Sequence, residues 1–444
     1  MSTNISLKHI NKLAIPALIA GVAEPILSIT DTAIVGNLTE NATESLAAVG
    51  IVGTFISMLI WVLGQTRSAI SSIVSQYVGS DNLQKVKNLP AQAIFITTGI
   101  SIFIILGTYP FADSIFRLYN ASDLILNYSV EYYQIRVFGF PFTLFTFAIF
   151  GTFRGLQNTF YPMIIAIVGA SVNIVLDVIL VYGIEGYIPA MNIKGAAYAS
   201  VIAQMLMAII SAYYLLKKTD IPLRFSFPFN KEINRFLIMI LNLFVRTLAL
   251  NITLYFASSF STSYGKEYIA AYTIAINLWF LGAFIIDGYA SAGNILSGKL
   301  LGGKEYGKLL TLSNKLMKYG VILGVILAAT GTIFYNFIGH VFTQEEAVLI
   351  QFYNIFWIIL AMQPLCAIAF IFDGMFKGLG KMKVLRNVLL MATFLVFLPV
   401  LFLLDSLDYK LFGIFIAFTF WVIARGLPLI IKFRQEFLPL SEKQ

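Results

Sequence analysis

Five carboxylate side chains interrupt otherwise apolar stretches of this 444-residue sequence: Glu24, Asp31, Asp177, Asp287 and Asp373. An acid at the centre of a hydrocarbon layer costs at least about 2.5–3.5 kcal/mol, so each of these residues needs a reason to be there. Because a dry cavity disfavours the charged form, such a group can bind and release a proton near neutral pH. Its oxygens also suit a hard cation such as sodium. The pattern therefore indicates reversible binding of a proton or a cation.

The spacing of two of these acids places them on one helix face. Glu24 and Asp31 are seven residues apart, which at 100° per residue leaves them within about 20° of each other. Pro25 lies between them and is expected to break the helix locally and act as a hinge. The alternative is that Asp31 has a structural role, as a cap or as a partner of Arg67.

A second polar pair follows the same logic. Asn173 and Asp177 are four residues apart, so they share a face of another helix. Ser200, on the next apolar stretch, can add a hydroxyl oxygen. We therefore predict a cation or proton site formed by Asp31, Asn173, Asp177 and Ser200 with Glu24, where sodium would bind transiently and no metal is fixed.

Other polar and aromatic residues in the apolar stretches are candidates for lining a substrate cavity. Aromatic rings can contact organic cations through stacking and cation–π interactions. Helix packing is the alternative for each of them, because aromatic residues make up 15% of the chain. The candidates are Tyr132, Tyr133, Arg67, Asn251, Asp287, Asn294 and Asp373.

The composition identifies the elements that must position these residues. Hydrophobic residues make up 59% of the chain and charged residues only 12%, against about 25% in soluble domains. The mean hydropathy is +0.84. This excludes an ordinary soluble enzyme and a disordered chain. With one cysteine and two histidines, the sequence cannot form an intrachain disulfide, and these counts argue against zinc chemistry.

The apolar stretches are long enough to cross a bilayer as helices. Twelve are predicted, at residues 10–35, 47–78, 91–110, 131–152, 160–183, 195–216, 236–258, 269–297, 316–338, 349–374, 384–404 and 411–432. The first carries two acids and no cleavage site, so it is expected to remain as a helix rather than be removed as a signal peptide.

Basic residues predict how these helices are oriented. Most of the 30 Lys and Arg residues fall on the side that holds both termini, and the positive-inside rule makes that side cytoplasmic. Two, Arg67 and Arg246, were assigned to spans, and five were assigned to the other side: Arg117, Arg136, Lys194, Lys266 and Lys410. The net charge of +8 then faces lipid headgroups of a plasma (inner) membrane rather than nucleic acid.

The two halves of the chain resemble each other. A shift of 223 residues aligns them without a gap from about 46 to 156, and it pairs Gly151 with Gly374 and Gly155 with Gly378. Six helices per half give both halves the same orientation, as in transporters that rock two bundles. We predict an all-α polytopic membrane protein with an N-lobe at 1–216, a cytoplasmic linker at 217–235 and a C-lobe at 236–444.

Several motifs resemble a known family. The runs EPILSITDTAIVGNL (24–38), RGLQNTFYPM (154–163), SVNIVLDVILVYG (171–183) and DGYASAGNILSGKLLGG (287–303) are similar to motifs of multidrug and toxic compound extrusion (MATE) transporters, the last to their DinF-like branch. The resemblance implies export of organic, often cationic compounds driven by inward proton or sodium flow, and two six-helix lobes around a V-shaped cavity.

The resemblance also implies roles for particular residues. Asp31, Asn173 and Asp177 match the family's N-lobe cation site, and Ser200 stands where this branch often has Thr. Asn294 departs from the family, which often has Glu there.

The sequence therefore predicts a secondary antiporter of drug-like compounds, expected to act as a monomer without a cofactor. No phosphate-binding loop or nucleophile elbow is visible, so neither ATP use nor enzymatic activity is expected. A lipid-linked oligosaccharide flippase is an alternative; it should show a basic cavity, and the assignment of only Arg67 and Arg246 to spans disfavours it. An ion channel is a further alternative.

Overall fold

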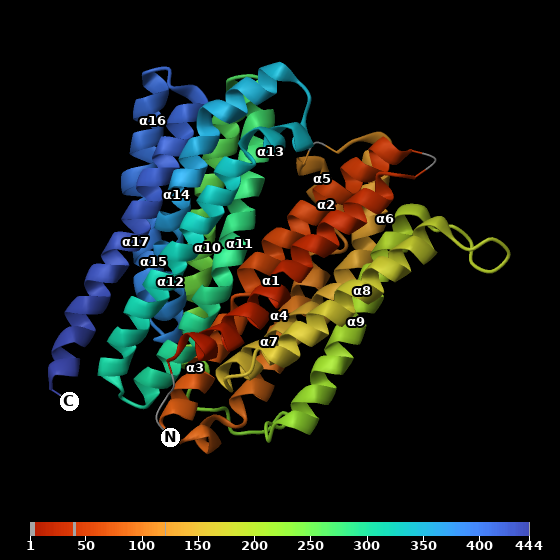
Figure 1. The fold of residues 1–444 in the computed structure, drawn as a ribbon. Helices are drawn as coiled ribbons and strands as arrows, with labels where there is room; N and C mark the ends of the chain where they lie inside the picture. The colour runs from red at the N-terminus through yellow and green to blue at the C-terminus, as the bar shows by residue number, and fades with distance from the viewer. Residues whose placement is uncertain (1–4, 39–40, 120, 444) are drawn as a thin grey trace. The chain divides into compact units, whose positions relative to one another are not determined.

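The computed structural model describes residues 5–38, 41–119 and 121–443, with the side chains of 23–29 left undescribed. Helices dominate this part of the chain, and a single antiparallel bridge between Ile184 and Ile188 is the only strand-like pairing in it (Figure 1). The all-α architecture predicted from the apolar stretches is therefore confirmed.

Nine helices precede the middle of the chain. They are α1 (Leu7–Val35), α2 (Ala42–Leu63), α3 (Thr66–Gly79), α4 (Leu89–Thr108), α5 (Ala112–Leu118), α6 (Asp123–Arg136), α7 (Phe140–Gly155), α8 (Phe160–Tyr182) and α9 (Asn192–Lys218). Short 3₁₀ turns, η1 (Leu83–Val86) and η2 (Val137–Gly139), lead into α4 and α7.

Eight more helices follow. They are α10 (Ile233–Ser263), α11 (Lys266–Gly302), α12 (Tyr306–Ile333), α13 (Tyr335–Phe342), α14 (Glu346–Gly378), α15 (Met382–Met391), α16 (Leu398–Ser406) and α17 (Lys410–Glu442). A π-helical segment, η3 (Ala392–Phe397), joins α15 to α16.

Eleven segments within the described residues are long and apolar enough to cross a membrane. The segments Ala42–Gly79 and Asp123–Gly155 each combine two helices into one crossing. Every one of the eleven overlaps a predicted span, and the 29-residue helix α1 occupies the remaining predicted range. The long, continuous apolar runs explain this agreement, because a helix satisfies its backbone groups internally in lipid.

The residue contacts divide the chain into two compact units. The C-unit comprises Met1–Leu18, Ser75–Asp81 and Leu241–Gln444, and the N-unit comprises Ile19–Val74 and Asn82–Ile240. The beginning of α1 therefore belongs with the second half of the chain. Within the C-unit, the start of α1 and the end of α17 lie at the same end (Figure 1).

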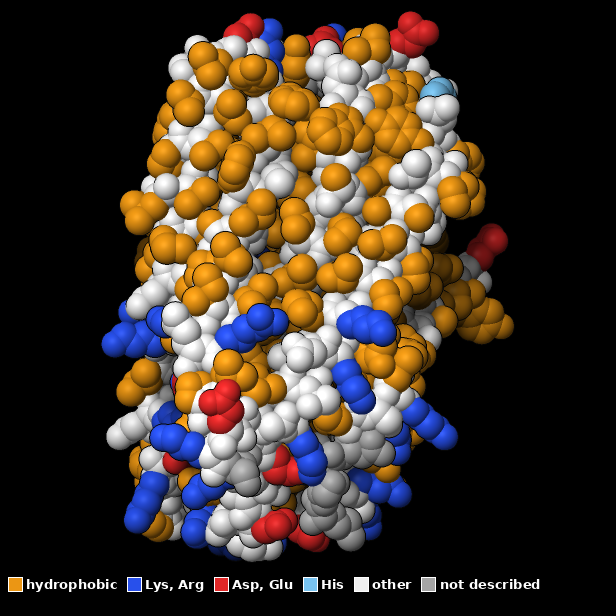
Figure 2. All heavy atoms as spheres, turned by 60° about the vertical axis from the view of Figure 1, so that its left-hand side comes forward, with side chains coloured by type: hydrophobic (Ala, Val, Ile, Leu, Met, Phe, Trp, Pro, Cys, Tyr) orange, Lys and Arg blue, Asp and Glu red, His pale blue; other side chains and the backbone are white. Residues whose placement is uncertain are grey.

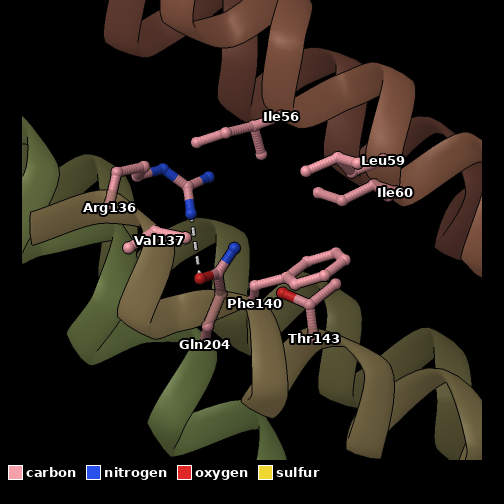
Figure 3. A pocket seen from close by; sticks show the side chains of 8 residues that line it. All are labelled: Ile56, Leu59, Ile60, Arg136, Val137, Phe140, Thr143 and Gln204. Atoms are coloured by element: carbon pink, nitrogen blue, oxygen red, sulfur yellow. Dashed lines mark hydrogen bonds between the residues drawn. The ribbon is translucent and has the colours of Figure 1, made fainter. Parts of the chain in front are cut away.

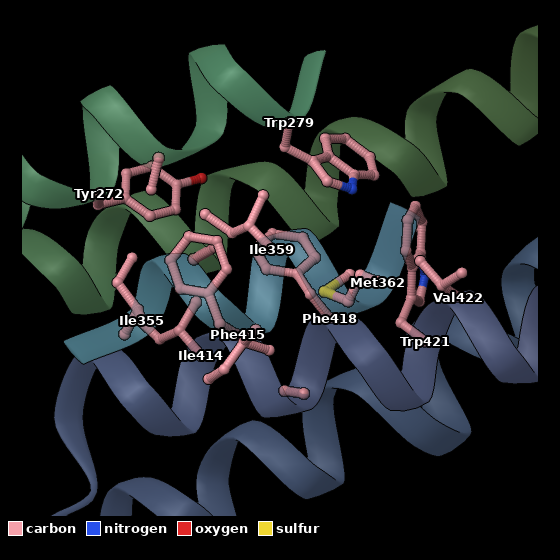
Figure 4. Close-up of a cluster of buried hydrophobic side chains, with 14 of the residues drawn as sticks. Tyr272, Trp279, Ile355, Ile359, Met362, Ile414, Phe415, Phe418, Trp421 and Val422 are labelled. Atoms are coloured by element: carbon pink, nitrogen blue, oxygen red, sulfur yellow. The ribbon is translucent and has the colours of Figure 1, made fainter. Parts of the chain in front are cut away.

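Each unit has its own aromatic core. In the C-unit, Trp279 stacks on Phe418, and Phe418 contacts Trp421 edge to face (Figure 4). In the N-unit, Phe55 makes edge contacts with Phe116 and Tyr133. Such pairs add about 0.5–1.5 kcal/mol to the burial of their area, so aromatic side chains account for much of the packing that positions the helices.

The internal repeat is visible as a repeated helix contact. A Cβ atom at Gly151 of α7 would lie 2.5 Å from the backbone oxygen of Arg67 on α3. A Cβ at Gly374 of α14 would overlap the backbone of Ala290 on α11, and residue 290 is residue 67 shifted by 223. The same relation holds for a second set of contacts: Gly155 with Ser71 and Gly378 with Asn294. The matched glycines are therefore kept by close backbone approach.

The surface has a broad apolar region. On the face shown in Figure 2, hydrophobic side chains cover most of the area, and Lys and Arg gather toward one end. Large hydrophobic side chains such as Phe103, Ile209 and Leu395 are 77%, 58% and 71% exposed. A surface of this kind suits contact with lipid and not with water, as expected for a multi-pass membrane protein.

Candidate functional site

A buried polar cluster lies within the N-unit, where α1, α8 and α9 contribute side chains. Ser200 Oγ of α9 donates a hydrogen bond to Asp31 Oδ2 of α1 at 3.0 Å. Asn173 Nδ2 of α8 lies 3.4 Å from Ser200 Oγ. Asp177, one helical turn after Asn173, interacts with the carboxyl of Asp31. The structure thus brings together four of the five residues of the predicted site, and all four are buried.

The oxygens of this cluster are short of donors. Asp31 Oδ1, Asn173 Oδ1 and both carboxyl oxygens of Asp177 accept no hydrogen bond from a donor among the described residues. Leaving a buried acceptor unsatisfied costs about 1–3 kcal/mol, and more when the group is charged. Four such oxygens at one place therefore favour occupation by a proton or a small cation.

The contact between the two carboxyl groups also favours a bound proton or small cation. Two ionised carboxylates repel each other when they are this close, whereas one shared proton turns the repulsion into a hydrogen bond. Arg136 adds one nearby positive charge that acts on both Asp31 and Asp177. With both acids ionised the cluster has a net charge of about −1, which one monovalent cation or one proton neutralises.

Arg136 belongs to this cluster, and the sequence analysis did not include it. It was counted with an outside connection although it lies within the predicted span 131–152. In the structure it is the last residue of α6, and its Nη1 donates to Gln204 Oε1 of α9 at 2.9 Å (Figure 3). Tyr132, one turn earlier, contacts the guanidinium and lies near both acids. The four-residue spacing of Tyr132 and Arg136 was the available signal.

The η2 turn makes room for this arrangement. Gly139 ends the turn between α6 and α7, and a Cβ at this position would overlap the side-chain amide of Gln204. A small cavity of about 10 Å³ lies beside the Arg136–Gln204 pair (Figure 3), which is room for roughly one water molecule. Its other lining residues are Ile56, Leu59, Ile60, Val137, Phe140 and Thr143.

A second buried charged cluster lies within the C-unit. Asp373 of α14 accepts a hydrogen bond from Arg246 Nη2 of α10 at 2.5 Å through Oδ1. Its Oδ2 lies 3.0 Å from Lys377 Nζ, one turn along α14. Arg425 Nη2 of α17 approaches Oδ1 at 3.5 Å. Asp373 and Arg246 were interpreted as cavity or packing residues, and the structure places them in one ion-pair cluster.

This cluster corrects one premise of the sequence analysis. Only Arg67 and Arg246 were assigned to membrane spans, and the small number of basic residues was used against a flippase. Arg425 is buried within α17, and Lys377 is largely buried near the end of α14. Lys and Arg were sorted by connection, although Arg425 lies within the predicted span 411–432, and this sorting hides basic side chains that turn inward to reach a buried acid.

Several of the remaining predicted residues have contacts of other kinds. Tyr133 packs against Phe55 and donates to Thr108 Oγ1, so its role is in the core. Arg67 lies over the ring of Phe147, and Asp287 is exposed on α11.

Asn251 and Asn294 are also placed. Asn251 donates to the backbone oxygen of Thr247 within its own helix, and Asn294 is buried on α11. The side chains of Glu24 and Pro25 lie outside the described residues.

Comparisons with known proteins define the class to which this fold and site belong. The profile of the MatE family matches residues 16–179 and 239–403. DNA damage-inducible protein F of Escherichia coli K12 is 26% identical over 435 residues, which cover 96% of this chain and 91% of that protein. Multidrug export protein MepA of Staphylococcus aureus is 23% identical over 412 residues, covering 90% and 87%.

A solved structure shares the fold. A crystal structure of a MATE protein in its bent conformation superposes with a TM-score of 0.90 at 21% identity, covering 98% of this chain and 96% of the other. This likeness shows the fold. The family match shows that the chain belongs to the MatE family, as its motifs indicated, and it is therefore a multi-pass membrane transporter and not an enzyme; the family's function is multidrug efflux.

Proposed function

We propose that the protein is an antiporter that exports organic, often cationic compounds in exchange for protons or sodium ions. The observation that carries this proposal is the cluster of four buried oxygens on Asp31, Asn173 and Asp177, which accept no hydrogen bond from the part of the chain that the structure describes. A purely structural cluster would be expected to satisfy its own acceptors. An exchanged ion supplies the missing partner for part of each transport cycle.

The cycle follows from the charge of the cluster. When the site faces the outside, a proton or sodium ion neutralises Asp31 and Asp177 and favours release of the exported compound. When it faces the cytoplasm, the ion leaves, and the restored negative charge attracts a cationic substrate. Pro25 is proposed as the hinge of α1, and Glu24 as a further acid of the site. A shift in occupancy of this kind requires that the ion bind the two states differently.

The neighbouring residues support either ion. Contact between the Asp31 and Asp177 carboxyls suits a proton, whereas carboxylate, amide and hydroxyl oxygens from three helices suit sodium. Arg136 opposes binding of any cation and so helps the site to empty. Tyr132 is proposed as the substrate-cavity residue nearest to the acids.

The wider organisation is proposed from the sequence. We propose an N-lobe at 1–216, a linker at 217–235 and a C-lobe at 236–444, with both termini in the cytoplasm. The protein would act as a monomer in the plasma membrane.

Counterflow in proteoliposomes tests the proposal. Purified protein is reconstituted with a cationic dye inside, and a pH gradient and a sodium gradient are imposed separately. One gradient is expected to drive dye movement in the wild type, and Asp31→Asn and Asp177→Asn are expected to abolish it.

The matched control is Asp113→Asn, an exposed acid of α5 that pairs with Arg117, which is expected to transport normally. Normal driven transport in both cluster variants would refute the proposal. Channel-scale current from the same liposomes would instead favour the ion-channel alternative.

A further inference from the structure

The C-unit cluster contains more positive than negative charge. Arg246, Lys377 and Arg425 surround the single carboxylate of Asp373. These four side chains sum to about +2, and Asp287, which acts on Lys377 from a greater distance, reduces the excess to about +1. Excess charge in a low-dielectric interior is costly unless a counter-ion accompanies it. The cluster therefore favours an anionic partner.

Arg425 is the member of the cluster that has N–H donors left to bind an anion. Both oxygens of Asp373 have closer partners, since Arg246 takes Oδ1 at 2.5 Å and Lys377 takes Oδ2 at 3.0 Å. Arg425 reaches Oδ1 only at 3.5 Å, and its Nε has no partner among the described residues although it is buried. A guanidinium carries five N–H donors in a fixed fork, so Arg425 keeps donors for a carboxylate or phosphate.

The scaffold around Arg425 holds its guanidinium in place. The group lies over the rings of Phe370 and Trp421, at 4.8 and 5.4 Å from their centroids. Trp421 Nε1 in turn donates to Thr393 Oγ1, in the π-helical segment η3. A π-helical turn of this kind is frequent at functional sites. A guanidinium that packs against aromatic rings keeps the N–H donors of its edge, and these donors can bind both oxygens of an anion.

The internal repeat shows that the acid at the centre of the cluster is not required by the scaffold, although a basic residue stands at the position of Lys377 in both halves. Shifting by 223 residues maps Asp373 onto Phe150 and Lys377 onto Arg154, both within the gap-free alignment. The matched glycine contacts beside them are present in both halves. Equivalent helix packing is therefore achieved in the N-unit without the acid at the centre of this cluster.

We infer that the C-unit cluster is a binding site for an anionic group of the transported compound, most simply a carboxylate that pairs with Arg425. The inference rests on the proposed function in taking the ligand to be an exported solute. It adds a recognition element that the acidic cluster does not supply, namely a basic site in the C-unit for the anionic group of the solute. Lys377 is the most exposed member of the cluster, with 15% of its side chain accessible against 7% for the other three, so the ligand is expected to approach beside it.

A pair of dyes that differ in one carboxylate tests the inference. Rhodamine 110 carries a free carboxylate, and rhodamine 123 is its methyl ester. Binding of each to purified full-length protein is measured by fluorescence anisotropy, without any ion gradient. Arg425→Gln is expected to weaken binding of rhodamine 110 at least about tenfold, the effect of losing hydrogen bonds to a charged group, and to leave rhodamine 123 within about twofold.

Two further variants serve as controls. Lys432→Gln removes the same charge from an exposed position of the same helix and is expected to change neither affinity. Arg425→Lys keeps the charge but loses the fork, and is expected to weaken rhodamine 110 about threefold or more. If Arg425→Gln lowered the affinity for both dyes equally, or for neither, the inference would be overturned. If the glutamine variant does not fold, unchanged affinity of Arg425→Lys for rhodamine 110 would overturn it instead.

The wild type alone provides another arm. Benzoate is expected to displace rhodamine 110, and benzamide, which lacks the charge, is not. Displacement by both or by neither counts against the inference. Displacement by phosphatidylglycerol but not by benzoate would assign the site to a lipid headgroup and overturn the exported-solute source. Because no gradient is used, these outcomes are independent of whether Asp31 and Asp177 couple transport.

Discussion

The N-unit and the C-unit share two matched glycine contacts, but their buried charged clusters differ in sign. In the N-unit, Asp31 and Asp177 exceed the single positive charge of Arg136. In the C-unit, three basic side chains exceed the single carboxylate of Asp373. The repeated glycine contacts show that packing does not require either cluster. The two units therefore indicate that the helix packing and the buried polar residues of a repeated fold can change independently of each other.

The largest expected effect is a difference in how much the two clusters contribute to the stability of the protein. Asp373→Ala leaves three buried basic groups without their common partner, so it is expected to destabilise the protein by about 3–5 kcal/mol. Asp31→Asn removes one of two repelling acids and is expected to stay within about 0.5 kcal/mol of the wild type. Thermal unfolding in detergent measures both. A greater loss of stability in Asp31→Asn than in Asp373→Ala would reverse the comparison.

The next effect tests whether the two units share their packing. Gly151→Ala and Gly374→Ala each place a methyl group against the backbone of a neighbouring helix, and each is expected to cost about 1–3 kcal/mol. Gly99→Ala in α4 is the control, because no atom lies within 4 Å of the added Cβ, and it is expected to gain up to about 1 kcal/mol. The same thermal measurement applies, and a loss in one unit only would show that the contacts are not equivalent.

Removing the positive charge of the N-unit cluster sharpens the comparison. Arg136→Gln takes away the charge that opposes cation binding, so the concentration of coupling ion for half-maximal exchange is expected to fall about three- to tenfold. Proteoliposome exchange at varied pH and sodium concentration measures this value. Arg117→Gln, which breaks an exposed ion pair on α5, is the control and should match the wild type. A higher half-maximal concentration in Arg136→Gln would contradict the assigned role.

The smallest effect concerns one hydroxyl group. Ser200→Ala removes the donor to Asp31 Oδ2 and one potential cation ligand, and it is expected to raise the half-maximal ion concentration about threefold. Ser200→Thr keeps the hydroxyl and is expected to restore the wild-type value in the same assay. If the threonine variant behaved like alanine, the hydroxyl would not be a ligand.

Much of the fold could be predicted because it depends on local sequence. Continuous apolar runs define the spans, and the four-residue spacing of Asn173 and Asp177 correctly places both side chains in one cluster. The approach of Asp31 to α8 and α9 is a long-range contact, between residues 169 apart in the case of Ser200. The sequence analysis grouped these residues because they are polar side chains in apolar stretches, and the resemblance to a family implied the same set; spacing alone does not show that these helices meet.

The C-unit cluster could not be predicted in the same way. Asp373 is 127 residues from Arg246 and 52 residues from Arg425 along the chain. No periodicity connects α10, α14 and α17, and a long basic side chain near a helix end can extend either to the headgroups or inward. The four-residue spacing of Asp373 and Lys377 was available in the sequence, but only the packed structure shows that Arg246 and Arg425 also turn toward this acid.

The contact between Trp421 and Arg425 supplies an intrinsic spectroscopic probe. Indole emission responds to a charge placed against the ring, and Trp421 is fully buried beneath the guanidinium. The sequence contains four tryptophans, and replacing Trp61, Trp279 and Trp357 with phenylalanine would leave one emitter. Occupancy at this position then becomes readable as a wavelength shift from an unlabelled protein, in real time and in either detergent or lipid.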